Sequence, residues 1–329
     1  MTTLRFADSH NDLLMSVLHQ QQSGVDTTWG SWWVDQLVAG GVDLQVLPIC
    51  MTDAFAQEAA LRRTLLMVDA AYRLADTHRD RVAIVTSAEE IREARRKGLI
   101  GLVLAMEGAE AIGRDPGMLR VLHRLGIRMI ALTWNRRTAF ADGAGEPEPG
   151  GGLTVLGREV LAEMEELGVI ADVSHLSQGG FLGLAEHATR PFIASHSSAM
   201  ALHEHRRNLT DEQLRIIAAK DSFVGVNAYG VFLAEAGRRT METYVDHIAH
   251  IAGIIGDART GLGADFILDV FCDTEPTGSF GDDSEHLVAF RRPEDFPALG
   301  EVLIRRFGAH VAEGIAGANL TRFLERSLS

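Results

Sequence analysis

The chain contains eight short apolar runs, most of them separated by longer stretches with helical periodicity. Each run is nearly continuous in apolar residues and ends in polar ones. The runs cover residues 4–10, 42–52, 101–108, 127–134, 168–175, 191–197, 222–228 and 260–266. Runs of this kind are typical of parallel strands that helices cover on both faces. Eight alternating strand and helix units favour a (β/α)8 barrel over a doubly wound sheet.

The helical patterns between the runs support this assignment. One covers residues 58–78; a second begins after Thr154, a suitable N-cap, and ends at Gly168; a third begins at Thr210 with an acidic first turn. The main alternative is an open sheet with a nucleotide at its switch point. It is disfavoured because no run is followed by a GxGxxG or GxxxxGK[ST] loop.

Two segments outside these units bear on domain organisation. The sequence "DGAGEPEPGGG" (142–152) is rich in Gly, Pro and Glu, and we expect a surface loop that either covers the site or is a plain connector. The tail from residue 285 predicts closing helices and no separate domain. Residues 1–329 are therefore expected to form a single barrel domain.

Charge and cysteine content exclude several classes of partner. With 45 acidic residues against 31 Lys and Arg, the net charge is −14, which argues against binding to nucleic acid or to an anionic membrane. Cys50 and Cys272 cannot form a disulfide framework, and buried free thiols are expected. The first residues show no signal peptide, and no apolar run approaches the roughly 18 residues of a membrane span. We therefore expect a cytoplasmic protein.

Six ionisable residues follow the apolar runs, where a barrel keeps its catalytic groups. They are His10, Asp12, Glu107, His175, His196 and Asp265. Taken singly, each has an ordinary explanation: a histidine after a strand is more often structural, and an acid at a strand end often caps the next helix. Taken together, six such groups at one rim would be unstable without a compensating cation.

Imidazole and carboxylate are ligands that suit borderline divalent metals, and there are enough of them for two ions. His10, Asp12 and Glu107 could hold one ion, and His175 and His196 a second, with Glu107 as the bridge between them. Two ions roughly 3.5–4 Å apart can share a water, lower its pKa and clamp the attacked carbonyl. Asp265 would then act as a general base that becomes a general acid.

A pair of arginines follows His196 in the segment 195–214. Either Arg206 or Arg207 could grip a substrate carboxylate in bidentate fashion, although a solvated basic pair before a helix is the ordinary reading. The residues alone do not choose between the two arginines. Four further histidines are expected outside the site: His203 and His205 at the surface, and His247 and His250 on a helix without a third ligand.

Seven stretches of this chain resemble the membrane dipeptidase (renal dipeptidase) family of metal-dependent amidohydrolases. They occur in the family's order between residues 8 and about 266. The stretches are "DSHNDLLM", "LAMEGAEAI", "LGIRMIALTWN", "GLTVLGREVLAEMEELGVIADVSHLS", "PFIASHSSAMALHEHRRNLTDEQLR", "DSFVGVNAY" and "GLGADF". Any one of them is a weak signal, but seven in order are specific, above all "SHSSA" followed by "RRN".

The resemblance implies a (β/α)8 barrel that binds two zinc ions through the five ligands given above. It implies hydrolysis of small dipeptides, often with a D-residue at the C-terminal position. It also makes Arg207 the contact for the substrate carboxylate and Asp265 the acid/base residue, and it suggests a homodimer. Two alternatives stay open: an amidase or lactonase of the same superfamily, and a catalytically inactive metal-binding relative.

One position departs from the family pattern. Mammalian members have a histidine after the fourth strand that contacts the substrate and the developing oxyanion, whereas this chain has Trp134. Indole donates one hydrogen bond and carries no charge, so Trp134 has a weaker part in substrate binding or Asn135 substitutes for it. Mammalian members are also anchored secreted proteins, and this chain shows neither a signal nor an anchor.

Overall fold

The computed structural model describes residues 4–24, 28–50, 59–146, 151–267, 270, 286–287 and 289–328. Eight parallel strands close into a barrel in the order β1-β2-β4-β5-β6-β7-β8-β9, and β9 pairs with β1. The strands are β1 (Phe6–Asp8), β2 (Val42–Cys50), β4 (Ile100–Glu107), β5 (Ile127–Ala131), β6 (Ile170–Asp172), β7 (Ile193–Ala194), β8 (Phe223–Asn227) and β9 (Thr260–Gly263). Every expected run overlaps one of these strands, so the predicted (β/α)8 barrel is confirmed.

One strand was not expected from the sequence. The short strand β3 (Val82–Ile84) lies outside the closed ring and pairs with the first residues of β4, Val82 opposite Ile100. It contains only three residues, two of them half-buried, so it lacks the continuous apolar run that identifies the barrel strands.

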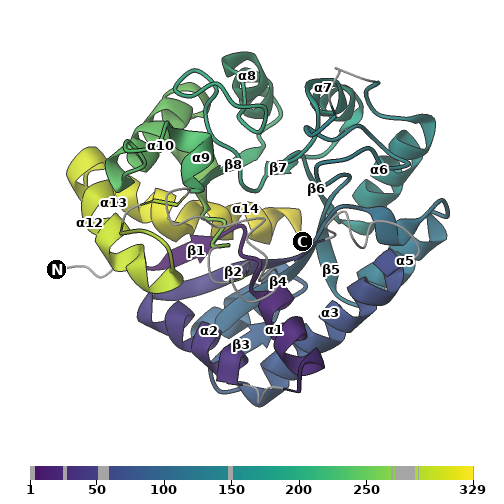
Figure 1. The fold of residues 1–329 in the computed structure, drawn as a ribbon, viewed down its shortest axis with the longest axis horizontal. Helices are drawn as coiled ribbons and strands as arrows, with labels where there is room; N and C mark the ends of the chain where they lie inside the picture. Colours follow the sequence, from purple (N-terminus) through teal and green to yellow (C-terminus); the bar gives the residue numbers. More distant parts are fainter. Residues whose placement is uncertain are drawn as a thin grey trace.

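Helices surround the strands and connect them in turn (Figure 1). The first half of the chain contributes α1 (Leu13–Gln22), α2 (Thr28–Ala39), α3 (Ala59–Thr77), α4 (Ala88–Arg96), η2 (Glu110–Ile112), α5 (Gly117–Arg124) and α6 (Val155–Leu167). The second half contributes α7 (Gln178–His187), α8 (Asp211–Ala219), α9 (Gly230–Leu233), α10 (Met241–Ile255), η3 (Asp257–Arg259), η5 (Pro293–Asp295), α12 (Phe296–Phe307), α13 (Ala309–Glu313), η6 (Gly314–Ala318) and α14 (Asn319–Ser327).

The predicted helix boundaries at α6 and α8 are confirmed, and local hydrogen bonds explain them. Thr154 caps α6 by accepting from the backbone N–H of Gly157, and Gly168 ends that helix in the left-handed conformation. Thr210 and Gln213 form a reciprocal capping box at the start of α8. The segment before α6 carries Trp134 and Asn135, and the segment before α8 carries His196 and Arg207, so these caps fix where each segment ends.

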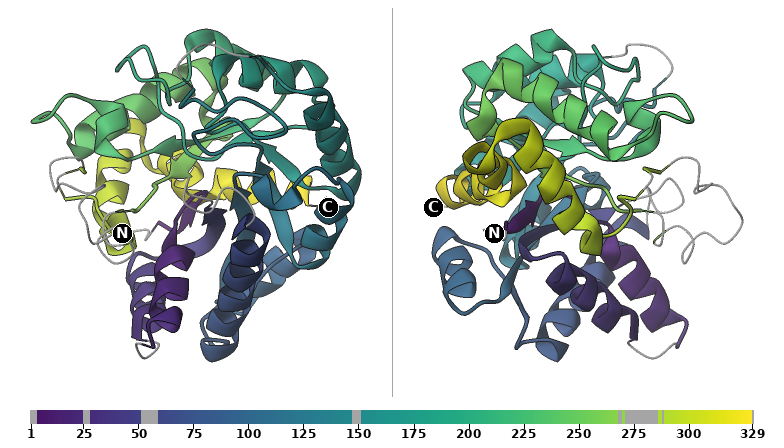
Figure 2. Two further views of the ribbon diagram at one scale, coloured as in Figure 1. Left: turned by 45° about the vertical axis from the view of Figure 1, so that its right-hand side comes forward. Right: turned by 90° about the vertical axis from the view of Figure 1, so that its left-hand side faces the viewer.

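The C-terminal helix α14 packs against the interior of the barrel. Its residues Leu320, Phe323 and Leu324 belong to one buried cluster with inward-facing residues of the strands, and Phe323 stacks on Phe223 of β8 with ring centroids 5.3 Å apart. In Figure 2 the yellow C-terminal helices lie beside the purple first strand. The predicted closing helices are thus part of the barrel's own core.

Alternation along the strands decides which polar residues reach the interior. In β4, Val103 and Ala105 belong to the interior cluster, and Glu107 continues on the same face. Glycine permits a close approach at the end of β9, because a Cβ at Gly263 would lie 2.0 Å from the carbonyl oxygen of Ser195. This brings the segment after β9 near the segment after β7.

The loop 142–152 was expected at the surface, and this expectation is wrong for its first part. Asp142 and Ala144 are buried, Asp142 forms an ion pair with Arg137, and Gly143 forms an isolated bridge with Leu176. Residues 147–150 lie outside the described part of the chain. Among the described residues, no helix has the length and apolar character needed to cross a bilayer.

Candidate metal centre

The six ionisable residues expected at the strand ends all lie together at the C-terminal end of the barrel. Glu107 is the last residue of β4. The other five occupy the segments that directly follow four strands: His10 and Asp12 after β1, His175 after β6, His196 after β7 and Asp265 after β9. Neither Glu107 nor Asp265 caps a helix. Ala109 holds the N-cap position of η2, the helix that follows Glu107, and no helix begins directly after Asp265 in the described residues. The ordinary explanation of Glu107 and Asp265 as caps is therefore wrong.

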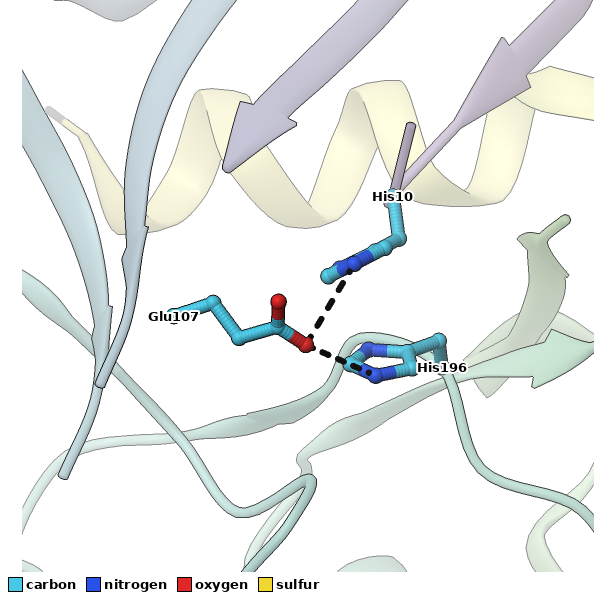
Figure 3. A group of neighbouring side chains, drawn as sticks. All are labelled: His10, Glu107 and His196. Carbon is cyan, nitrogen blue, oxygen red and sulfur yellow. Dashed lines mark ion pairs between the residues drawn. The ribbon is translucent and has the colours of Figure 1, made fainter. Parts of the chain in front are cut away.

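One carboxylate oxygen of Glu107 faces three imidazole rings. Its Oε1 atom lies 2.8 Å from Nε2 of His175, 3.2 Å from Nε2 of His196 and 3.5 Å from Nε2 of His10. Figure 3 shows His10 and His196 approaching this same oxygen from two sides. The Nε2 atoms of His175 and His196 are only 2.9 Å apart.

Two further carboxylates lie near the same nitrogen of His10. Its Nε2 atom lies 3.6 Å from Oδ2 of Asp12 and 3.9 Å from Oδ1 of Asp265. Ligand atoms of His10, Glu107 and His196 lie within 4.8 Å of one another, and so do those of His10, Asp12 and Asp265. Metal–ligand bonds of about 2.0–2.2 Å allow atoms at such separations to share one ion.

Hydrogen bonds on the far side of two rings determine which nitrogen faces the centre. Ser195 Oγ donates to Asp172 Oδ2 at 2.5 Å and lies 2.7 Å from Nδ1 of His196. Because this hydroxyl has already used its proton, Nδ1 of His196 must donate and Nε2 keeps a lone pair. His175 Nδ1 lies 3.1 Å from Oδ1 of Asn135, an acceptor, so its Nε2 is also free to bind a metal.

Two residues of the centre, His10 and Asp12, have buried polar atoms without a hydrogen-bond partner in the described chain. Both ring nitrogens of His10 and Oδ1 of Asp12 have no hydrogen bond, and both side chains are buried. Buried groups of this kind normally pair. A divalent cation is the partner that suits imidazole and carboxylate ligands, so the residues present fit a metal site.

The electrostatics of the centre also favour a cation. Burial opposes the charged form of His10, yet Glu107, Asp12 and Asp265 raise its pKa to about 10. Burial would raise the pKa of Glu107, but the neighbouring histidines hold it well below its ordinary value. Burial and then Arg207 lower the pKa of His175 to about 4. Without a metal, the carboxylates thus draw one proton onto His10, and a bound cation would take that place.

Asp265 lies at the edge of this group and is held in an unusual conformation. Its φ of 57° is in the left-handed region, as is the φ of 69° at His175. Asn227, on the inner face of β8, donates from Nδ2 to Oδ2 of Asp265 at 2.9 Å. Burial raises the pKa of Asp265 above its ordinary value. Strained backbone at two residues of one centre is typical of a functional site.

The two arginines after His196 have different environments. Arg207 is buried and Arg206 is exposed. The guanidinium of Arg207 lies over the ring of Phe232 at 5.6 Å, and its Nη2 donates to the carbonyl of His196 at 3.3 Å, whereas its Nε has no partner within the described chain. Burial lowers the pKa of Arg207 to about 10, so the group stays charged at neutral pH.

A cavity of about 200 Å³ opens beside the carboxylates and Arg207. Trp134 and Asn135 line it, and the Trp134 ring lies 6.1 Å from the His175 ring. His205 lines it too, half-buried and stacked on Phe232, so the expectation that His205 is a surface residue is wrong. The remaining lining residues are Asp12, Met15, Cys50, Glu107, His175, Arg206, Arg207, Tyr229, Phe232, Asp265 and Ile267.

Two histidines expected outside the centre lie outside it. His247 binds the backbone of Ala199 and Leu233, and His250 pairs with Asp211.

Sequence reasoning missed two buried aspartates, Asp8 and Asp172, that hydrogen-bond to the segments carrying the ligands. Asp172 accepts hydrogen bonds from the backbone and hydroxyl of Ser195, and Asp8 accepts from the backbone N–H of Ala264 at 2.7 Å and from Gln45. A signal was present, because each aspartate comes two or three residues before a histidine, in "ADSH" and "ADVSH". An aspartate inside an apolar run needs buried partners.

Comparison with known proteins gives a match over nearly the whole chain. The model of the membrane dipeptidase family (Peptidase family M19) matches residues 1–327. A dipeptidase of Clonostachys rogersoniana, verJ, is 30% identical over 279 residues, which cover 82% of this chain and 66% of that protein. For dipeptidase tcpJ of Claviceps purpurea the identity is 28%, with 81% and 60% covered. The chain thus spans 60–66% of the length of these two curated relatives.

Solved structures match over their full length. A metallopeptidase of family M19, described as dipeptidase AC, is 28% identical with a TM-score of 0.87, and 99% of each chain is covered. A metallopeptidase of Rhodobacter sphaeroides, liganded with a phosphinate mimic of the dipeptide L-Ala-D-Ala, is 27% identical with a TM-score of 0.84 and the same coverage.

Proposed function

Because this chain belongs to the membrane dipeptidase family, peptidase family M19, we propose that it is a metal-dependent hydrolase that cleaves small dipeptides. The observation that carries the proposal is the convergence of three imidazole Nε2 atoms within 3.5 Å of one Glu107 oxygen. Two of these rings, those of His175 and His196, are also held through Nδ1 so that Nε2 faces the centre, as is typical of metal-ligating histidines.

We assign His10, Asp12 and Glu107 to one divalent ion, and Glu107, His175 and His196 to a second. Zinc is the proposed metal, because imidazole and carboxylate ligands suit it and the family resemblance implies it. Such ions, when bound, would supply Lewis acidity and lower the pKa of a water molecule. The protein's own contribution is to hold the rings of His175 and His196 by their Nδ1 atoms and to exclude bulk water from the carboxylates.

Asp265 is proposed to move the proton. Its Oδ2 is held by Asn227, while Oδ1 faces the centre at 3.9 Å from His10 Nε2. A carboxylate with one fixed oxygen and one oxygen facing the reaction site can accept a proton from the attacking water and deliver it to the leaving amine.

Arg207 is proposed to bind the free carboxylate of the substrate. It is a buried cation at the wall of the cavity with an unpartnered Nε, and guanidinium pairs with carboxylate through two parallel hydrogen bonds. Trp134 and Asn135 lie beside His175 on the same cavity and would contact the substrate near the cleaved bond. The phosphinate ligand of the Rhodobacter sphaeroides relative supports L-Xaa-D-Xaa dipeptides as substrates.

The test compares dipeptides with their C-terminal amides on metal-loaded protein, using L,L and L,D pairs. We expect hydrolysis of the free acids and a kcat/KM about 10- to 100-fold lower for the amides, because a hydrogen-bonded charge pair is lost. Equal rates would contradict the role of Arg207 and would favour a general amidase. If metal-loaded protein cleaves none of these substrates, the dipeptidase proposal is wrong.

A further inference from the structure

The thiol of Cys50 lies near Glu107, the carboxylate proposed to bridge the two ions. Cys50 is the last residue of β2, and in the parallel pairing of β2 with β4 its register partner is Glu107. Residues paired in register on neighbouring strands point to the same face of the sheet. Leu44 and Val46, which alternate with Cys50 along β2, belong to the barrel's interior cluster. The Cys50 side chain therefore enters the centre from the side of β2.

The sulfur of Cys50 lies close enough to two carboxylates to share an ion with them. One ligand atom each from Asp12, Cys50 and Glu107 lie within 4.8 Å of one another, and all three side chains are buried. Zinc bonds of about 2.3 Å to sulfur and 2.0–2.2 Å to oxygen allow ligands at such separations to bind one ion. Cys50 is a free cysteine and lines the same cavity as Asp12 and Glu107.

A second observation shows that this corner of the centre lacks a partner. Oδ1 of Asp12 is buried and has no hydrogen bond within the described chain, and the residue is 5% exposed. A buried carboxylate oxygen without a donor needs a cation or a proton. Its neighbours Cys50 and Glu107 offer the remaining ligands for such a cation.

We propose that Cys50 provides a sulfur ligand to the ion that Asp12 and Glu107 hold, and that it biases this position toward soft and borderline cations. Sulfur ligands select zinc and cadmium, whereas a purely nitrogen and oxygen site accepts manganese more readily. The inference rests on the proposed metal centre and adds a ligand that the imidazole and carboxylate set does not include. The ordinary alternative is that Cys50 packs as a small apolar side chain.

Absorption spectroscopy of the cobalt-substituted protein tests the sulfur ligand directly. The full chain is freed of metal, loaded with Co²⁺ and compared with Cys50→Ser and Cys50→Ala. We expect the wild type to show a near-ultraviolet sulfur-to-cobalt charge-transfer band that both variants lack. Cys272→Ser is the matched control, because it removes the other thiol of the sequence and should leave the band unchanged.

The outcomes separate this inference from the proposed function. If Co²⁺ binds and its ligand-field bands appear without the charge-transfer band, the role of Cys50 is wrong and the metal centre stands. Loss of the band in Cys272→Ser, with retention in Cys50→Ser, would also overturn it. If no Co²⁺ binds to the wild type, both the metal centre and the role of Cys50 are wrong.

Competition between cations gives an independent readout. Replacement of Cys50 by Ser should weaken Cd²⁺ binding about tenfold or more. Loss of a residue that only supports a metal ligand already costs about tenfold, and loss of a ligand itself should cost at least as much. Mn²⁺ binding should change much less, because a hydroxyl is as good a ligand as a thiol for a hard cation. Equal losses for Cd²⁺ and Mn²⁺ would mean that the substitution disturbs packing only, and would contradict the sulfur ligand.

Discussion

At the scale of single residues, two rings of the centre are oriented by a partner on the side away from Glu107. Ser195 and Asp172 act on His196, and Asn135 acts on His175. These partners fix the tautomer, so Nε2 of each ring presents a lone pair to the centre. His10 has no such partner within the described chain, and its orientation depends on the carboxylates around it.

Asp265→Asn tests the proposed proton carrier. We expect kcat to fall roughly 100- to 10,000-fold, because the amide has the same shape but cannot accept the proton. Metal content should stay unchanged, which metal analysis of the same preparation checks. A variant that retains the wild-type kcat would remove Asp265 from the mechanism.

The arginine pair provides its own matched control. Arg207→Met should lower kcat/KM for free dipeptides about 10- to 100-fold, because the buried charge that faces the cavity is lost. Arg206 also lines the cavity, but its side chain is exposed, so Arg206→Met should lower kcat/KM much less, by about threefold at most. Steady-state kinetics on one dipeptide decides this prediction, and similar losses in both variants would contradict the assignment.

The sequence predicted which ionisable residues would gather, but several of their partners could not be found from it. Strand ends of a parallel barrel meet at one rim, so polar residues after apolar runs come together whatever the details of packing. The choice between Arg206 and Arg207, the burial of His205 and the bond from Ser195 to Asp172 depend on loop conformation. No periodicity encodes a loop conformation.

At the scale of elements, a neutral histidine joins α10 to the segment that carries His196. Nδ1 of His247 accepts from the backbone N–H of Ala199 at 3.1 Å, and Nε2 lies 3.0 Å from the carbonyl oxygen of Leu233. One nitrogen must accept while the other donates, so this bridge requires the uncharged ring. Burial lowers the pKa of His247 to about 4.

The lowered pKa of His247 predicts a pH-dependent stability. The unfolded chain binds a proton at this ring near its ordinary pKa of about 6.5, whereas the folded chain binds it only near 4. The contribution of the neutral ring is therefore fully present above about pH 6.5 and is lost as the pH falls toward 4, by up to roughly 3 kcal/mol. Urea unfolding of the wild type and of His247→Gln across this range measures it. A difference between the two proteins that does not change with pH would contradict the prediction.

Element boundaries were predicted well where a cap or an apolar run marks them. Thr154 and Thr210 cap the helices that were expected to start after them. Two short elements were not expected from the sequence: β3 has three residues and α9 has four. Such elements form because neighbouring elements pair with them or pack on them, and the local sequence carries little preference.

At the scale of the whole molecule, the two ends of the chain meet in one core. The π-helical turn η6 packs on β1, and α14 contributes to the interior cluster together with residues from most of the barrel strands. We propose on this basis that residues 1–329 form one domain that unfolds in a single transition. The homodimer implied by the family resemblance stays a prediction.

Phe323→Ala tests the role of α14 in this core. Phe323 is 2% exposed and stacks on Phe223, so its truncation should lower the free energy of unfolding by about 3–5 kcal/mol. Val155→Ala, at a 64% exposed position, should change it by less than about 0.5 kcal/mol. Two separate unfolding transitions in Phe323→Ala, with the main one unshifted, would show that α14 is not part of a single domain.

The central claim is that the side chains around Glu107 bind divalent metal ions on which dipeptide hydrolysis depends. The most direct measurement is a titration of chelator-treated, metal-free protein with Zn²⁺, in which bound metal and hydrolysis of a dipeptide are recorded on the same samples. The account predicts an inactive metal-free protein whose activity returns as zinc binds and levels off at two ions per chain. Full activity in protein shown to contain no metal would contradict it.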